Sequence, residues 1–289
     1  MAVHNVKGRL MGERESGSVR GHLMILVCAV LWSFGGVFVK VLRQRYGVEA
    51  PAIACLRSAA AAVVLGWALP RLKGAQLGRA CASALAYTVV VGSFVVAVAG
   101  TTAANAIFLQ YAYPAFVGVG AVVFFRERLG GRTILALALG LAGVATILAF
   151  SWRPEERTGL VCGFASSIAF AILALLQRGT RRGDPVALSS FYNLAAAVLL
   201  LPLAWGRLSI SGEALIVVAA MGIVQLGLPY VLFIRGLRSV PATDGALITL
   251  AEPILNPVWV WLVVSETPHW STLAGGGFIL LALLVRFAR

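Results

Sequence analysis

Residues 101–116 read TTAANAIFLQYAYPAF, and residues 240–255 read VPATDGALITLAEPIL. A shift of 139 residues places the first stretch on the second, so that Pro114 meets Pro253 and several polar positions coincide. Prolines and polar residues that match in one register indicate an internal repeat rather than a chance likeness between two apolar segments.

The chain around this repeat is too apolar for a water-soluble protein. Of its 289 residues, 60% are hydrophobic and only 12% are charged, and the mean hydropathy is +0.91. Soluble domains average roughly 45–50% apolar and about 25% charged residues. The composition therefore predicts an integral membrane protein.

The net charge of +13 does not indicate a nucleic-acid-binding protein. The basic residues form short clusters between apolar runs, as cytoplasmic loops of membrane proteins do, and no nucleic acid partner is expected. The four cysteines form no CxxC pair and only three histidines are present, so no metal or other cofactor is expected either. The polar start of the chain is unlike a cleavable signal peptide.

Ten membrane-spanning helices are predicted from the apolar runs. A helix needs about 20 mostly apolar residues to cross a bilayer. The runs free of charged residues are 21–39, 80–125, 133–152, 158–177, 185–206, 214–234 and 267–285, and two further spans with charged residues are about 50–69 and 241–264. The run 80–125 is long enough for two helices, with a turn expected at Gly100-Thr101-Thr102. The predicted fold is therefore an all-α membrane bundle.

Loop charges predict the orientation of this bundle. Most Lys and Arg residues lie in loops on the same side as both termini, which places the termini in the cytoplasm. We expect a cytoplasmic tail at 1–20, a first five-helix repeat at 21–152 and a second at 158–287. Because five is an odd number, the two repeats enter the membrane in opposite directions. Inverted repeats of helices are typical of secondary transporters.

Four stretches of the sequence resemble a known family. They are LWSFGGVFVK at 31–40, APAIACLR at 50–57, FFRERLGGRTILALALGLAGVATIL at 124–148 and its weaker echo VVSETPHWSTLAGGGFILLALLV at 263–285. These motifs resemble the EamA-type members of the drug/metabolite transporter superfamily, over about residues 21–287. The resemblance implies ten helices in two inverted repeats, and export of amino acids and related metabolites, aromatic amino acids included.

Two polar helix faces are the candidates for a transport pathway. Thr249, Glu252 and Asn256 are spaced three and four residues apart, which places them on one face of a continuous helix. Glu252 is about 11 residues into its span, near the middle of the bilayer. The matching face of the fourth span carries Gln110 and Tyr113. We expect these faces to meet across a central pathway.

Aromatic residues are expected to contribute to the wall of this pathway. Trp32, Tyr87, Tyr113 and Tyr230 lie in helices that the family resemblance places around the cavity. An aromatic wall suits flat or apolar metabolites. Packing among the helices is the alternative explanation for these residues.

Prolines interrupt both of these spans. Pro114, Pro253 and Pro257 each leave one backbone carbonyl without its helical partner, which is tolerated in a membrane beside other helices or a wet cavity. We expect them to act as hinges, although simple bending for packing would also account for them.

Charged residues within the spans need a partner or a function. A carboxylate at mid-membrane costs about 3 kcal/mol, so Glu252 is expected to bind a substrate amine or to carry a proton. A protonated structural residue, or one paired with Arg57, is the alternative. Arg57 itself could reach outward to the surface or bind a substrate carboxylate. Asn105 and Asp244 lie near helix starts, where capping is expected. Glu266 is assigned to surface pairing, with gating as the alternative.

The sequence thus predicts a multi-pass transporter of the plasma (inner) membrane. It would export small organic metabolites, with amino acids as the favoured substrates, by alternating access, driven by the substrate gradient or by protons. No HExxH, Walker A or GxSxG motif indicates an enzyme. The alternative is a non-transporting membrane protein, such as a membrane-embedded enzyme or an assembly scaffold. The expected partners are a small-molecule substrate and membrane lipid, and no surface marks an oligomer.

Overall fold

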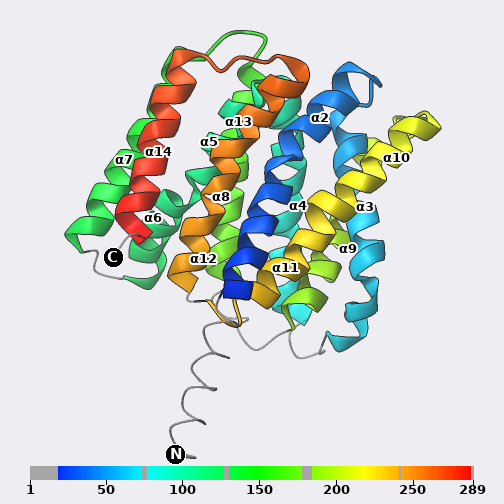
Figure 1. Ribbon diagram of the computed structural model, residues 1–289, viewed down its shortest axis with the longest axis horizontal. Coiled ribbons are helices and arrows are strands. Elements are labelled where there is room, and N and C mark those ends of the chain that lie inside the picture. Colours follow the sequence, from blue (N-terminus) through cyan, green and yellow to red (C-terminus); the bar gives the residue numbers. More distant parts are fainter. Residues whose placement is uncertain (1–18, 73–76, 127–129, 178–183, 241, 288–289) are drawn as a thin grey trace, which may run out of the picture.

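Every element of the computed structural model is helical (Figure 1). The structure describes residues 19–72, 77–126, 130–177, 184–240 and 242–287, and no strand occurs among them. Residues 1–18, most of the predicted N-terminal tail, lie outside this part. A helix over residues 19–33 comes first. The elements after it are α2 (Gly35–Gln44), α3 (Ala50–Leu65), η1 (Gly66–Arg71), α4 (Leu77–Gly100), α5 (Ala103–Tyr111), α6 (Tyr113–Phe125), α7 (Gly131–Phe150), α8 (Arg157–Gln177), α9 (Pro185–Ala204), α10 (Gly212–Ala220), η3 (Met221–Gly227), α11 (Leu228–Gly236), α12 (Ala242–Thr249), α13 (Ala251–Val264) and α14 (Trp270–Phe287).

Nine helices in the described chain are long and apolar enough to cross a membrane. Several are interrupted spans: α2 continues the span Val19–Gln44, α5 and α6 form Ala103–Phe124, and α12 and α13 belong to Asp244–Val264. A tenth helix, Trp270–Arg286, is apolar but shorter. The predicted all-α membrane architecture is confirmed, whereas the full count of ten rests on this shorter helix. The orientation of the termini stays a prediction.

The predicted turn inside the run 80–125 is present. α4 ends at Gly100 and α5 begins at Ala103, with Thr102 between them as the N-cap. The Thr102 hydroxyl accepts a hydrogen bond from the backbone N–H of Asn105 at 3.1 Å. Such a cap satisfies one of the amide groups that a helix start leaves without a partner.

The helices pack in pairs that relate the two halves of the chain. α3 packs on α9 and α7 packs on α14, so the second and fifth helices of one half contact those of the other. α4, α5 and α6 all pack on α8, and their counterparts η3 and α13 both contact α2. The interrupted spans also meet, because α5 packs on α13. In Figure 1, the start of the first span and the end of α14 lie at the same end of the bundle.

Two glycines allow the close crossing of α7 and α14. A Cβ added at Gly143 would meet the backbone oxygen of Gly275, and one added at Gly275 would meet that of Gly143. Small residues let membrane helices approach until their backbones touch, where dispersion forces are strongest. The tightest contact between the fifth and tenth helices thus depends on the absence of side chains.

The outer surface of the bundle is apolar. Large hydrophobic side chains such as Val63, Phe124 and Trp205 are 80%, 76% and 74% exposed. In water such a surface would drive aggregation, whereas a bilayer solvates it. All four cysteines are free thiols.

Candidate functional site

The two interrupted spans break at nearly equivalent points, just before their prolines. α5 ends at Tyr111 and α6 begins at Tyr113, which places Pro114 in the first turn of the new helix. α12 ends at Thr249, and α13 begins at Ala251, shortly before Pro253. Proline fits the first turn of a helix because its missing N–H is not needed there. The prolines therefore start new helices in the middle of each span, whereas Pro257 lies inside α13.

A tyrosine of one break contacts the carboxylate of the other. The Tyr111 hydroxyl donates a hydrogen bond to Oε2 of Glu252 at 2.7 Å. The Tyr111 hydroxyl oxygen also lies 3.3 Å from the backbone carbonyl oxygen of Thr249, the carbonyl that Pro253 leaves without a helical partner. Tyr111 thus satisfies polar groups that lipid could not, and it joins the two halves of the chain at mid-span.

The predicted polar faces do not meet as expected. Thr249 is the last residue of α12, and its hydroxyl donates to the backbone carbonyl of Ala246 rather than to a side chain of the fourth span. Gln110 donates instead to the Ser166 hydroxyl of α8 at 2.9 Å. Tyr113 likewise turns to α8, where its ring stacks on Phe170 at 4.2 Å. In the fourth span it is Tyr111 that reaches Glu252.

Asn256 is buried, and its side-chain amide forms no hydrogen bond. It has no exposed surface, and neither its amide oxygen nor its amide nitrogen has a hydrogen-bond partner. Its Oδ1 lies beside the position that a Cβ on Gly36 would occupy, so it faces the first span. A buried amide without partners costs about 1–3 kcal/mol, which favours a position where a ligand or water completes its hydrogen bonds.

Two of the predicted aromatic residues lie in a second polar cluster. The Tyr87 hydroxyl donates to Oδ1 of Asn193 at 3.0 Å, and its ring lies 5.8 Å from that of Tyr192. Tyr230 is close enough to Tyr87 to interact with it electrostatically. The fourth predicted aromatic residue, Trp32, packs on Phe233 of α11, with 5.3 Å between the ring centroids.

Arg57 belongs to the same cluster as Tyr87. Its side chain is buried, with the residue only 3% exposed, so it does not reach outward to the surface as one of the predicted alternatives required. None of the ion pairs among the described residues involves it, which also excludes the predicted pairing with Glu252 in this conformation. The guanidinium Nε has no hydrogen-bond partner. The bundle therefore holds a cation without a carboxylate beside it.

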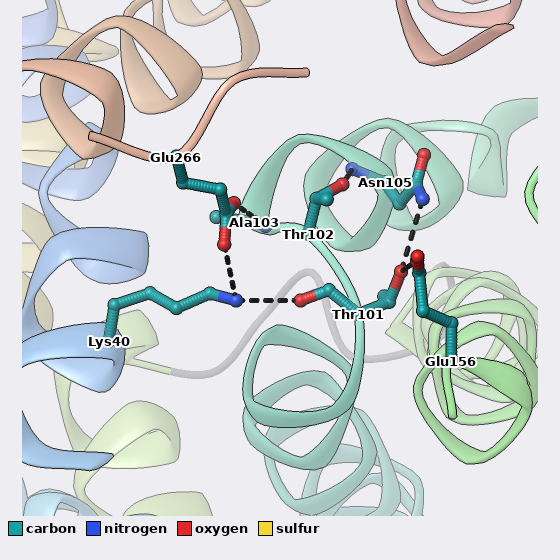
Figure 2. Close-up of polar contacts among 7 residues, drawn as sticks. All are labelled: Lys40, Thr101, Thr102, Ala103, Asn105, Glu156 and Glu266. Atoms are coloured by element: carbon teal, nitrogen blue, oxygen red, sulfur yellow. Dashed lines mark hydrogen bonds and ion pairs between the residues drawn. The ribbon is translucent and has the colours of Figure 1, made fainter. Parts of the chain in front are cut away.

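A network of polar contacts joins the helices at the end of the bundle opposite to the start of the first span and the end of α14 (Figure 1), and Figure 2 shows these contacts in close-up. Lys40 lies at its centre, where its ammonium group is 2.5 Å from Oε2 of Glu266 and donates to the backbone carbonyl of Thr101 at 2.8 Å. The other carboxylate oxygen of Glu266 accepts a hydrogen bond from the backbone N–H of Ala103 at 2.7 Å. We call the contacts of Lys40, Glu266, Thr101 and Glu156 the polar clasp.

The clasp extends to both sides of the turn between α4 and α5. The Thr101 hydroxyl donates to Glu156 at 2.5 Å and accepts from the Asn105 amide at 3.1 Å. Asn105 in turn accepts a hydrogen bond from the Thr272 hydroxyl of α14 at 2.7 Å. The expected capping function of Asn105 therefore belongs to Thr102, and Asn105 links helices instead.

The expected surface pairing of Glu266 is also wrong. The side chains of Lys40 and Glu266 are only 9% and 18% exposed, so the pair is largely shielded from water. Asp244, by contrast, lies in the first turn of α12, where half-exposed His22 is 4.0 Å away.

A cavity of about 250 Å³ lies beside the break in the fourth span. Tyr111, Tyr113 and Pro114 line it, together with small residues of α7 and α14. The hydroxyl that binds Glu252 thus belongs to a cavity-lining residue. Among the described residues, no group of His, Cys, Asp and Glu side chains could hold a metal ion.

Comparison with known proteins identifies the family. The profile of the EamA-like transporter family matches residues 19–149 and again residues 157–287. The chain belongs to the EamA-like transporter family. As an EamA-like transporter with two copies of the repeat, it is a membrane transporter of small metabolites.

Relatives of this EamA-like transporter carry transporter names. An uncharacterized transporter of Archaeoglobus fulgidus is 31% identical over 68% of this chain and 71% of its own length. The pseudopaline exporter CntI of Pseudomonas aeruginosa is 28% identical over 90% of this chain and 94% of its own length. A crystal structure with 18% identity covers 92% of this chain and 96% of its own at a TM-score of 0.64, which shows the same fold.

The polar clasp connects the two EamA repeats. Lys40 and Thr101 lie in the first repeat and Glu266 lies in the second, while Glu156 lies in the connection between them. Tyr111 and Glu252 join the two repeats a second time, at mid-span. The clasp escaped prediction because its members lie at span ends, far apart in the sequence. The available signal was Lys40, a lysine directly after the apolar run 21–39.

Proposed function

We propose that this EamA-like transporter exports amino acids, aromatic ones included, across the plasma membrane by alternating access between its two repeats. The observation that carries the proposal is the polar clasp, which joins the repeats at one end of the bundle while a carboxylate, a tyrosine and an unused amide lie at mid-span. A transporter that alternates needs such a contact, one that closes one side and can be replaced by another arrangement.

The charges of the mid-span groups favour a substrate that carries both an amine and a carboxylate. Glu252 would accept the ammonium group, because a carboxylate retained at mid-membrane is costly unless a cation or proton compensates it. Arg57 would receive the carboxylate, because a buried guanidinium without an acidic partner has the same requirement. The buried amide of Asn256 has hydrogen bonds to offer to either group.

The aromatic residues support the inclusion of aromatic amino acids. Tyr113 stacks on Phe170 and lines the 250 Å³ cavity, while Tyr87 lies near Arg57 and Tyr230 lies near Tyr87. Offset ring stacking would hold a flat side chain without demanding a particular substituent. The relative that is named an exporter supports the outward direction.

In the proposed cycle, the conformation described here is closed at the clasp. The start of the first span and the end of α14 lie at the opposite end of the bundle, the side on which the loop charges predict the cytoplasm. The clasp would then be the outer gate, and its opening would release the substrate to the outside. The prolines that start new helices at mid-span would allow one half of each interrupted span to move while the other stays packed.

Counterflow into liposomes tests this proposal. Liposomes that contain the purified protein and a high concentration of one unlabelled amino acid are diluted into a trace of the same amino acid in labelled form. We expect saturable uptake of phenylalanine, tyrosine or tryptophan that protein-free liposomes lack. If correctly folded protein moved none of the common amino acids, the proposed substrate class would be wrong.

A matched pair of variants separates the site from a general defect. Glu252→Gln should abolish counterflow, whereas Glu213→Gln, at the exposed start of α10, should leave it unchanged. Unchanged counterflow in Glu252→Gln would exclude Glu252 from substrate binding.

A further inference from the structure

A second cavity, of about 310 Å³, lies at the end of the bundle opposite to the clasp. Three elements enclose it: η1 at the end of the second span, the start of α9 and the end of α11 (Figure 1). Its lining consists of Trp67, Arg71, Asp184, Val186, Val231, Ile234, Arg235 and Arg238. None of these residues belongs to the clasp or to the mid-span groups.

This cavity has an excess of positive charge. Arg71 pairs with Asp184 at 3.4 Å, and the other carboxylate oxygen of Asp184 caps α9 by accepting from the N–H of Val186 at 2.9 Å. Arg235 and Arg238 have no ion pair or side-chain hydrogen bond with any residue that the structure describes, and both are exposed. Three guanidinium groups therefore face one carboxylate that is already engaged.

The remaining lining is apolar and suits the edge of a bilayer. Val186, Val231 and Ile234 contribute hydrocarbon, and the Trp67 ring is 53% exposed with the Arg71 guanidinium 4.7 Å above it. Tryptophan and arginine side chains of this kind gather at the level of lipid headgroups. The cavity thus combines a cationic rim with an apolar wall at a membrane surface.

We infer that this cavity binds the phosphate-bearing headgroup of an anionic phospholipid. Arg235 and Arg238 have donors free to bind the phosphate oxygens in pairs, as guanidinium groups do. The valine and isoleucine side chains contact the first part of the acyl chains. A volume of about 310 Å³ has room for a headgroup but not for a whole lipid, whose chains stay in the bilayer. Basic pockets between helices on the cytoplasmic side are suited to such lipids.

Native mass spectrometry of the delipidated protein tests this inference. Phosphatidylglycerol and phosphatidylcholine are titrated separately, because both carry phosphate but only the first has a net negative charge. We expect phosphatidylglycerol to bind more tightly. The Arg235→Gln/Arg238→Gln variant should lose about thirtyfold in affinity, since each basic residue near an anionic headgroup strengthens binding by about fivefold at low salt.

Two control variants make the result specific. Arg45→Gln/Arg153→Gln removes the same charge from exposed sites at the clasp end and should bind phosphatidylglycerol as the unmodified protein does. Arg235→Lys/Arg238→Lys keeps the charge but loses the paired donors, so its affinity should lie between those of the glutamine variant and the unmodified protein. Equal binding of phosphatidylglycerol by the glutamine variant would overturn the inference.

Competition with inorganic phosphate distinguishes a lipid headgroup from a free phosphate ion as the ligand of this cavity. We expect millimolar phosphate to displace little bound phosphatidylglycerol, because it lacks the apolar contacts. If phosphate alone competed fully, and the two lipids bound equally, the cavity would be a site for a free anion and the lipid assignment would be wrong. These measurements involve no transport, so they stand or fall separately from the proposed function.

Discussion

Replacement of Lys40 by methionine should open the polar clasp. The Lys40 ammonium is 2.5 Å from Glu266 and 2.8 Å from the Thr101 carbonyl oxygen, and the two charged side chains are 9% and 18% exposed. Removal of one partner from a buried ion pair costs about 3–5 kcal/mol, because the other charge is left without compensation. Glu266 keeps its hydrogen bond from Ala103 and some contact with water, so the lower end of that range applies.

A loss of about 3 kcal/mol from the closed conformation changes the closed-to-open ratio about 100-fold, since 1.36 kcal/mol corresponds to a factor of ten. Accessibility of Val260, which is 1% exposed below the clasp and faces Gly36, reports this change. In a variant without the native cysteines, Val260→Cys should react slowly with a membrane-impermeant maleimide. Addition of Lys40→Met should accelerate the reaction by up to about 100-fold.

A double variant and a control complete the test. Lys40→Met combined with Glu266→Gln removes both charges, so it should react more slowly than Lys40→Met alone. Arg45→Met, which removes an exposed cation just beyond α2, should not change the rate. If Lys40→Met reacted as slowly as its parent, the ion pair would not hold the two repeats together and the gating argument would be refuted.

Three further variants test other contacts. Tyr111→Phe should reduce counterflow less than Glu252→Gln does, because it removes the hydrogen bond and keeps the carboxylate; equal losses would show that the tyrosine acts beyond that bond. Arg57→Gln should raise the KM for amino acids at least tenfold while it leaves binding of the corresponding amines unchanged, and an equal loss for both would contradict carboxylate binding. Gly159→Ala should lower the thermal unfolding temperature and weaken the clasp, at a cost of about 1–3 kcal/mol, because its Cβ would lie within 3 Å of the Gly100 backbone. Gly78→Ala, where a Cβ meets nothing, should be neutral, and equal unfolding temperatures would argue against that close contact.

The all-α membrane fold and the repeats could be predicted because they follow from composition and spacing. Apolar runs of fixed length predict spans, and the turn after Gly100 follows from a run too long for one helix. The register that aligned Pro114 with Pro253 also predicted that both spans would be disturbed there. These features depend on local sequence and on the thickness of the bilayer, which one sequence is enough to show.

The arrangement of the candidate site could not be predicted in the same way. The predicted face of Thr249 and Glu252 assumed one continuous helix, whereas α12 ends at Thr249 and α13 begins at Ala251, so the two residues lie in different helices. Gln110 forms a hydrogen bond with Ser166 of α8 instead of a residue of the ninth span, because the available hydrogen-bond partners depend on how the helices cross. Lys40 and Glu266 are 226 residues apart in sequence, and the local sequence around either residue does not identify the other as its ion-pair partner.

The most direct test of the account is whether transport requires the clasp to open. Lys40→Cys/Glu266→Cys in protein without native cysteines is reconstituted and treated with a reducible bis-methanethiosulfonate crosslinker. Amino-acid counterflow should stop on crosslinking and return on reduction, whereas the two single variants should be unaffected by the reagent. Full counterflow through the crosslinked protein would contradict alternating access between the two repeats at this gate.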